Sequence, residues 1–308
     1  MSYRLTRRQA IGTLAWAAAA SGSLPVGQSS KGGFKYCLNT ATIRGQRLPL
    51  AKIVQIAAET GYDAVEPWLD EVERAVAGGE TYASIRRMFE DRRLACPSLI
   101  AFPHWIVDDR NRRKKGIDEA RRAMEVCAEI GSGAIAAPPA GATSGPPVAL
   151  DAAAERYARL LEIGAEYGVV PQLELWGFSR TLGRLSEAIY VAVQSGRPDA
   201  TLLLDVFHLY KGGSGFDTLH LIHAGNMRVF HVNDYPARPS RETVSDRDRV
   251  YPGDGIAPWK TILAALRQTG FRGYLSVELF NRAYWQQPAE QTAAAALRRT
   301  KAVVDRAS

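Results

Sequence analysis

This 308-residue sequence lacks the cysteine patterns of a disulfide framework and of a structural zinc site. Its three cysteines, Cys37, Cys96 and Cys127, lie far apart inside apolar runs, and no C-x-x-C pair occurs. An odd number of isolated cysteines argues against a disulfide scaffold and indicates buried, inert thiols.

The sequence also lacks a strongly apolar run of about 20 residues, the length that crosses a bilayer, so we expect no stable membrane span.

The sequence has only a weak excess of positive charge. It contains 39 Lys and Arg residues and 32 Asp and Glu residues, which gives a formal charge of +7. Residues 1–30 hold three arginines and no acid, so the rest carries 36 minus 32, or +4. This weak charge does not favour nucleic acid as a partner.

The first 30 residues have the pattern of a targeting segment. Arg7-Arg8 precedes a short, mildly apolar stretch at residues 11–26 that is rich in Ala and Gly. A paired arginine before such a stretch is typical of a twin-arginine signal, and a basic tail or a buried helix is the alternative. We expect the twin-arginine translocase to export the chain, which would be periplasmic or secreted. Residues 31–308 then form a single folded domain.

Short apolar runs alternate with helical patterns along the remaining 278 residues (308 minus 30). Continuous apolar strands between helices predict a parallel sheet covered by helices. Helices are expected at residues 50–60, 118–130, 151–167 and 259–269. The charge run at residues 110–115 is interpreted as the solvated start of a helix. The eight expected strands are residues 34–42, 64–68, 95–102, 134–140, 169–176, 201–210, 228–234 and 274–280.

The connections between these elements are asymmetric. Strand-to-helix loops are long, as at residues 103–116 and 235–256, and the latter is a candidate lid. Helix-to-strand turns are short and start on a glycine at Gly61, Gly131, Gly168, Gly196, Gly225 and Gly270. Eight such units predict a single (β/α)8 TIM barrel with its site at the carboxyl ends of the strands. An open doubly wound sheet is the alternative, but no G-x-G-x-x-G follows the first strand.

Four consecutive strands each carry one ionisable side chain inside an apolar run, namely Glu174, Asp205, His231 and Glu278. Such groups are costly to bury unless they are paired or bind a cation. Buried ion pairs are the alternative, but these strands hold no matching set of Lys or Arg. Three carboxylates and one imidazole suit a divalent cation.

These positions, with Asp205-x-x-His208, His231-x-Asn233-Asp234 and Pro252-Gly253-Asp254-Gly255, resemble the xylose isomerase-like barrels, and within them the inosose (2-keto-myo-inositol) isomerases. The resemblance implies that Glu174, Asp205, His231 and Glu278 bind one Mn, Co, Zn or Mg ion. It also implies that His208 faces the hydroxyls of a sugar or cyclitol.

The implied reaction is proton transfer next to a ketone through an enediolate, which a cation stabilises. Glu174 and Glu278 are our candidates for the two carboxylates that remove and return the proton.

Other residues near the expected active face are weaker candidates for substrate binding: His104, Arg180, Lys211 and Arg249. A structural hydrogen bond is the alternative for His104, and surface solvation for the three cations. Glu66 and Trp68 are expected to form pocket wall or ordinary packing.

Three functions remain open from the sequence. The first is a metal-dependent isomerase or epimerase of a keto-sugar or keto-cyclitol. The second is a lyase that expels the aglycone from a 3-keto-glycoside, and the third is a non-catalytic sugar-binding barrel. Abasic-site endonucleases share the fold, but their three-zinc cluster needs more histidines than the five present here.

Overall fold

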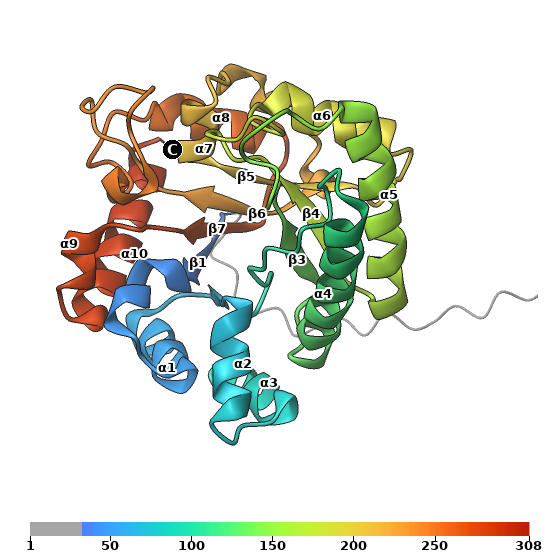
Figure 1. Cartoon of the computed structure of the whole chain (residues 1–308). Helices are drawn as coiled ribbons and strands as arrows, with labels where there is room; N and C mark the ends of the chain where they lie inside the picture. Colours follow the sequence, from blue (N-terminus) through green and yellow to red (C-terminus); the bar gives the residue numbers. More distant parts are fainter. Residues whose placement is uncertain (1–32, 308) are drawn as a thin grey trace, which may run out of the picture.

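Parallel strands and helices alternate along residues 33–307, the part of the chain that the computed structural model describes (Figure 1). The predicted export signal, residues 1–30, lies outside these residues. The strands are β1 (Lys35–Asn39), β2 (Ala64–Glu66), β3 (Ala134–Ala137), β4 (Val170–Glu174), β5 (Thr201–Asp205), β6 (Met227–Val232) and β7 (Tyr274–Val277).

The α-helices lie between and after the strands. They are α1 (Leu50–Thr60), α2 (Leu69–Ala77), α3 (Tyr82–Asp91), α4 (Arg110–Glu129), α5 (Leu150–Tyr167), α6 (Leu185–Gln194), α7 (Val206–Lys211), α8 (Trp259–Gln268), α9 (Arg282–Trp285) and α10 (Ala289–Arg306). Short 3-10 helices are η1 (Thr40–Gln46), η2 (Asp217–Leu221), η3 (Ala224–Asn226) and η4 (Asp246–Asp248).

The sheet has the order β2-β1-β7-β6-β5-β4-β3, and all its strand pairs are parallel. The segment from Ala95 to Ile100 lies between the two ends of this order, with bridges from Ala95 to Ala64 of β2 and from Leu99 to Ile135 of β3. This segment closes the barrel, so the predicted TIM barrel is confirmed. Its third wall segment forms isolated bridges instead of the expected continuous strand at residues 95–102.

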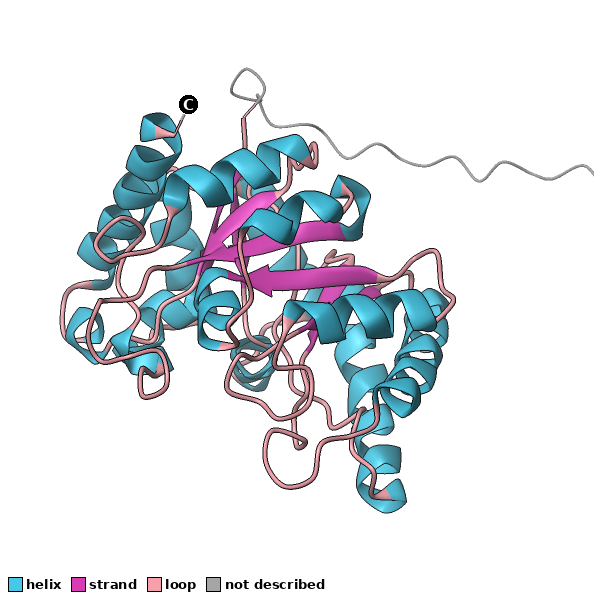
Figure 2. Cartoon of the chain, turned by 90° about the horizontal axis from the view of Figure 1, so that it is seen from above, coloured by secondary structure: helices cyan, strands magenta, loops and turns pink. Residues whose placement is uncertain are grey.

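Helices surround the strands on the outside, as the view from above shows (Figure 2). Inside the barrel, Ile100, Ala136, Leu203 and Val229 form a small buried cluster of their own. Burial of apolar faces on both sides explains why the strands read as continuous apolar runs. Within residues 33–307, no helix has the length and apolar character of a membrane span.

Several local predictions are confirmed and others are wrong. Gly61 and Gly168 end α1 and α5 with φ values of 91° and 67°, a region that glycine enters without steric cost. Gly225 instead lies inside η3.

The charge run at residues 110–115 does start a helix. The helix α4 begins at Arg110, and the Asp109 side chain accepts a 2.7 Å hydrogen bond from the Arg112 N–H.

The largest difference is at residues 201–210, which were expected to form one strand. β5 ends at Asp205, and α7 begins at the next residue. The Asp205 side chain accepts a hydrogen bond from the backbone N–H of His208, an N-cap contact that favours a helix start at this point. His208 therefore lies on a helix above the barrel.

Candidate active site

Three potential metal ligands converge at the carboxyl ends of β5, β6 and β7. Asp205 ends β5, His231 lies on β6, and Glu278 follows β7 directly. Asp205 pairs with His231 in the strand register. One ligand atom from each side chain lies within 4.8 Å of the others, and all three residues are buried. Nδ1 of His231 is 3.5 Å from Oε2 of Glu278 and 3.9 Å from Oδ2 of Asp205.

Glu66 fixes the orientation of the His231 ring. Its Oε2 atom lies 2.9 Å from Nε2 of His231 and also accepts hydrogen bonds from Ser276 and Asn39. With Nε2 facing this carboxylate, Nδ1 points at Asp205 and Glu278, where it has no hydrogen-bond partner. A buried imidazole nitrogen without a partner, aimed at two carboxylate oxygens, fits the donor set of a divalent cation.

Arg249 lies against the same two carboxylates. Its Nη1 atom is 3.0 Å from Oδ2 of Asp205 and 3.0 Å from Oε2 of Glu278. The side chain is fully buried, and it comes from the loop at residues 235–256. The expectation that no buried cation would match these acids was therefore wrong in part. It considered only the strands, and this arginine follows η4 in the loop.

The charges in this cluster shift one another's titration. Burial alone would raise the pKa of Glu278, but His231 and Arg249 lower it to about 2. Burial alone would lower the pKa of His231, but Glu66 and Glu278 raise it well above its usual range. Without a cation the cluster is thus neutralised in part by an imidazolium and a guanidinium.

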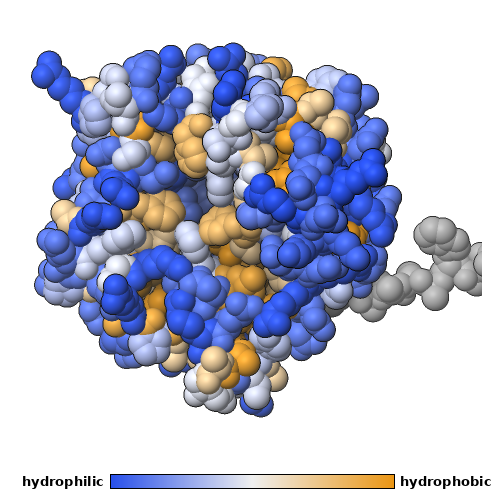
Figure 3. All heavy atoms as spheres, viewed as in Figure 1, coloured by the Kyte–Doolittle hydropathy of each residue, from blue (hydrophilic) through white to orange (hydrophobic). Residues whose placement is uncertain are grey.

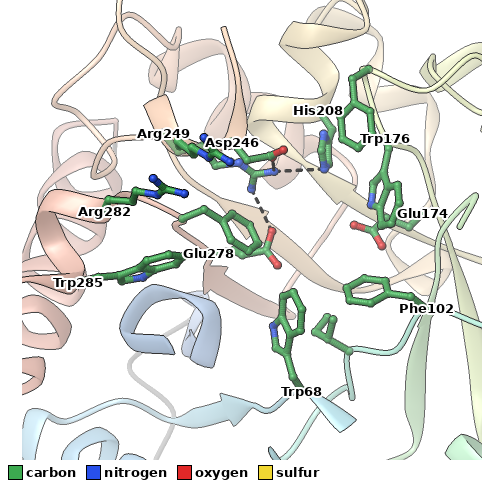
Figure 4. Close-up of a pocket in the computed structure, with 14 residues that line it drawn as sticks. Trp68, Phe102, Glu174, Trp176, His208, Asp246, Arg249, Glu278, Arg282 and Trp285 are labelled. Atoms are coloured by element: carbon green, nitrogen blue, oxygen red, sulfur yellow. Dashed lines mark hydrogen bonds and ion pairs between the residues drawn. The ribbon is translucent and has the colours of Figure 1, made fainter. Parts of the chain in front are cut away.

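Glu174 ends β4 and has a different environment. It is buried at the cavity wall, and it is absent from the three-residue cluster that the described part of the chain forms. Burial, followed by the charges of Glu278 and Asp205, raises its pKa to about 8. The two carboxyl groups of Glu174 and Glu278 lie on opposite sides of the cavity (Figure 4).

His208 lies beside the cluster on α7. Its backbone N–H donates to Oδ1 of Asp205 over 2.8 Å, and its Nε2 lies 3.2 Å from Nη2 of Arg249. Burial lowers the pKa of His208, and the positive charge of Arg249 acts in the same direction. The ring faces the cavity, as expected from the sequence (Figure 4).

The cavity above these residues has a volume of about 410 Å³. In the surface view, apolar side chains gather around a hollow near the middle of the face, with hydrophilic ones around them (Figure 3). The cavity is lined by Trp68, Ile100, Phe102, Glu174, Trp176, Phe178, His208, Asp246, Arg247, Arg249, Glu278, Phe280, Arg282 and Trp285.

Three predicted substrate-binding residues lie outside this lining. The Lys211 ammonium donates to the backbone carbonyls of Arg241 and Glu242, so it holds the 235–256 loop. The His104 ring packs against Gly141, where an added Cβ would come within 2.9 Å of it. Arg180 is exposed, and its backbone N–H donates to Thr143.

Several site residues were not predicted from the sequence. Asn233 donates to Oδ2 of Asp205, and Asp246 pairs with Arg249 over 2.5 Å. Glu66 contacts His231, although the sequence favoured ordinary packing as the role of Glu66. The signal available in the sequence was the position of Glu66 at the end of a short apolar run, which resembles the position of Glu174.

One protein-family model and several proteins of known name are similar to this chain. The model of the xylose isomerase-like TIM barrel family matches residues 54–303. An inosose isomerase of Bacillus velezensis is 28% identical over 276 residues, covering 88% of this chain and 98% of its own. A fructoselysine 3-epimerase of Escherichia coli O157:H7 is 25% identical, covering 76% of this chain and 86% of its own.

Among solved structures, an IolI protein with a bound zinc atom superposes with a TM-score of 0.83 at 24% identity, covering 89% of this chain and 99% of that chain. At this identity the likeness shows the fold alone. The family match extends over most of the chain and includes all four predicted metal ligands. The chain therefore belongs to the xylose isomerase-like TIM barrel family.

Proposed function

We propose that this protein is a divalent-metal-dependent isomerase or epimerase that acts on a ketone-bearing sugar or cyclitol. One observation carries the proposal: the unpartnered Nδ1 of His231 converges with carboxylate oxygens of Asp205 and Glu278 below a cavity that Glu174 also lines. The relatives named inosose isomerase and fructoselysine 3-epimerase support the reaction class.

Asp205, His231 and Glu278 would hold the cation, with Glu174 as a fourth ligand across the cavity. A divalent cation would stabilise the negative charge that develops on substrate oxygens when a proton leaves the carbon beside a ketone. His208 and Arg249 line the same cavity as Glu278 and would lie near these oxygens. In the structure the Arg249 guanidinium donates to Asp205, Glu278, Asp246 and Nε2 of His208.

The two glutamates can move the proton. Glu278 carries a charge at neutral pH and can accept a proton from the carbon beside the ketone. Glu174 lies across the cavity, and in the metal-free protein burial raises its pKa to about 8. When it is not bound to the cation, it can therefore return a proton to a neighbouring carbon or to the opposite face. One proton leaves carbon and one is added, so the substrate changes structure without changing composition.

The test is solvent exchange. The protein, loaded with Mn²⁺, is incubated with keto-inositols and 3-keto-glycosides in deuterated water, and deuterium on the carbon next to the carbonyl is measured by NMR. We expect label in wild type and loss of at least about 100-fold in the rate for Glu174→Gln and Glu278→Gln. Glu119→Gln, an exposed position on α4, serves as the matched control.

Isomerised product without solvent label would contradict the two-glutamate scheme. Sugar binding without any turnover would favour a non-catalytic sugar-binding barrel.

Elimination is a second candidate, because it begins with the same proton abstraction. A 3-dehydroshikimate dehydratase of Pseudomonas putida is 24% identical over 81% of this chain, although the match covers 39% of that protein. A 3-keto-glycoside that splits into two products in the experiment above would support the lyase, whereas a product of unchanged mass would support the isomerase.

A further inference from the structure

Five aromatic rings form a continuous arc around one side of the cavity. In order they are Phe280, Trp68, Phe102, Trp176 and Phe178, and we call them the aromatic arc. Their neighbouring ring centroids are 6.1, 4.9, 5.6 and 5.6 Å apart. They follow four wall segments of the barrel, because Trp176 and Phe178 both follow β4, so the contact of the other rings is a product of the fold.

Two rings of the arc are open to solvent. Trp68 and Trp176 are partly buried, whereas Phe102 and Phe178 are 37% and 44% exposed. Among the large exposed apolar side chains of residues 33–307, these two line the cavity above the acids. Exposed aromatic side chains in a concave site are costly to solvate and are typical of ligand-binding surfaces.

Four of the polar side chains that line the same cavity are buried, whereas those of Arg247 and Arg282 are exposed. Glu174, His208, Arg249 and Glu278 are all buried, and these groups are sufficient for one ketone-bearing ring. The aromatic arc lies beside them, with the ring centroids of Phe178 and His208 5.7 Å apart. A cavity of about 410 Å³ lies in the range of sites that hold ligands larger than one small ring. The solvent-exposed part of the cavity beside Phe102 and Phe178, which we call the outer half, therefore has apolar surface that the proton transfer itself does not need.

We propose that the outer half of the cavity is a subsite for a second ring, aryl or glycosyl, attached to the sugar or cyclitol. The second ring would stack against Phe102 and Phe178, as flat or ring-shaped groups do on aromatic faces. The inference rests on the proposed function, because it places the ketone-bearing ring between Glu174 and Glu278. It narrows the substrate class from free monosaccharides to substituted ones.

The experiment measures binding, so that it does not depend on turnover. Full-length protein with Mn²⁺ is titrated calorimetrically with methyl β-D-glucoside, phenyl β-D-glucoside and cellobiose. We expect the phenyl glucoside or cellobiose to bind at least about fivefold more tightly than the methyl glucoside. The phenyl and cellobiose arms distinguish an aryl from a glycosyl group.

Variants then locate the subsite. Phe102→Ala and Phe178→Ala should each reduce this preference about twofold or more, and the double variant should bring it close to unity. Both side chains are partly exposed, so the variants should fold, which thermal unfolding checks. Val193→Ala, an exposed apolar position on α6 that does not line this cavity, should keep the full preference.

Equal affinity for all three ligands, a preference that survives in the double variant, or no binding in the millimolar range would overturn the inference. Failure of the proposed function has a different result, since solvent exchange would then be absent while the preference for a second ring persisted.

Discussion

The Arg249 guanidinium and the Asp205 carboxylate form a fully buried ion pair, with Nη1 at 3.0 Å from Oδ2. The same nitrogen is 3.0 Å from Oε2 of Glu278. These are the two oxygens that face Nδ1 of His231. A divalent cation held by Asp205, His231 and Glu278 would therefore share its carboxylate oxygens with a guanidinium.

This arrangement predicts that Arg249→Gln binds a divalent cation more tightly, by at least about tenfold, because a repelling positive charge is removed. The metal-free variant should lose about 3–5 kcal/mol of stability, since two buried acids then lack their partner. Calorimetric titration with Mn²⁺ and thermal unfolding in chelator measure the two effects. Arg298→Gln, at an exposed position on α10 that does not line the cavity, should change neither. Weaker cation binding by Arg249→Gln would contradict the competition.

Glu66→Gln should weaken cation binding about 10- to 100-fold, because the ring orientation and basicity of His231 depend on this carboxylate. Titration of the variant with Mn²⁺ and with Zn²⁺ checks this expectation, with Glu119→Gln as the control. Affinity equal to that of the wild type would show that Glu66 has only a packing role.

The raised pKa of Glu174 predicts how stability depends on pH without metal. Its folded pKa of about 8 exceeds the unfolded value near 4.5, so ionisation of the folded protein is disfavoured. The resulting loss of stability begins as pH rises above about 4.5 and is complete above about 8. Glu174→Gln removes this loss, and it should be more stable than wild type by a few kcal/mol at pH 8 and about equal at pH 4. Denaturant unfolding in chelator across this range measures the difference, and a pH-independent difference would contradict the assignment.

We propose that residues 1–30 direct export, and Arg7 and Arg8 offer the test. Changing both to lysine should leave the protein in the cytoplasm of a bacterium that has the twin-arginine translocase. Fractionation and immunoblotting locate the protein, and Arg4→Lys is the control. Periplasmic protein in the double-lysine variant would contradict a twin-arginine signal.

Much of the fold could be predicted because its signals are local. The apolar runs and the glycines at Gly61 and Gly168 predict their elements without knowledge of the rest of the chain. The start of α7 was missed because residues 206–210 are apolar enough to continue a strand. Its signal is the Asp205 side chain, and a single capping residue after an apolar run is difficult to distinguish from a strand end.

The candidate site could be predicted where strands carry it. Asp205, His231 and Glu278 follow from ionisable groups inside apolar runs, and the parallel sheet brings them together. The burial of Arg249 could not be predicted, because it depends on two acids that lie 44 and 29 residues away in the sequence. Lys211 and His104 lie outside the cavity lining for a similar reason, since the direction of a side chain near a loop depends on tertiary contacts.

The segment from Ala95 to Ile100 has a consequence for self-association. Without it, β2 and β3 would be the free edges of a seven-stranded sheet, and unpaired edges can add strands from other molecules. The backbone N–H of Val65 donates to Ala95, and that of Leu99 donates to Ala134. Both edges are thus occupied within one chain, and this protects the barrel against edge-to-edge aggregation even though the third wall segment is irregular.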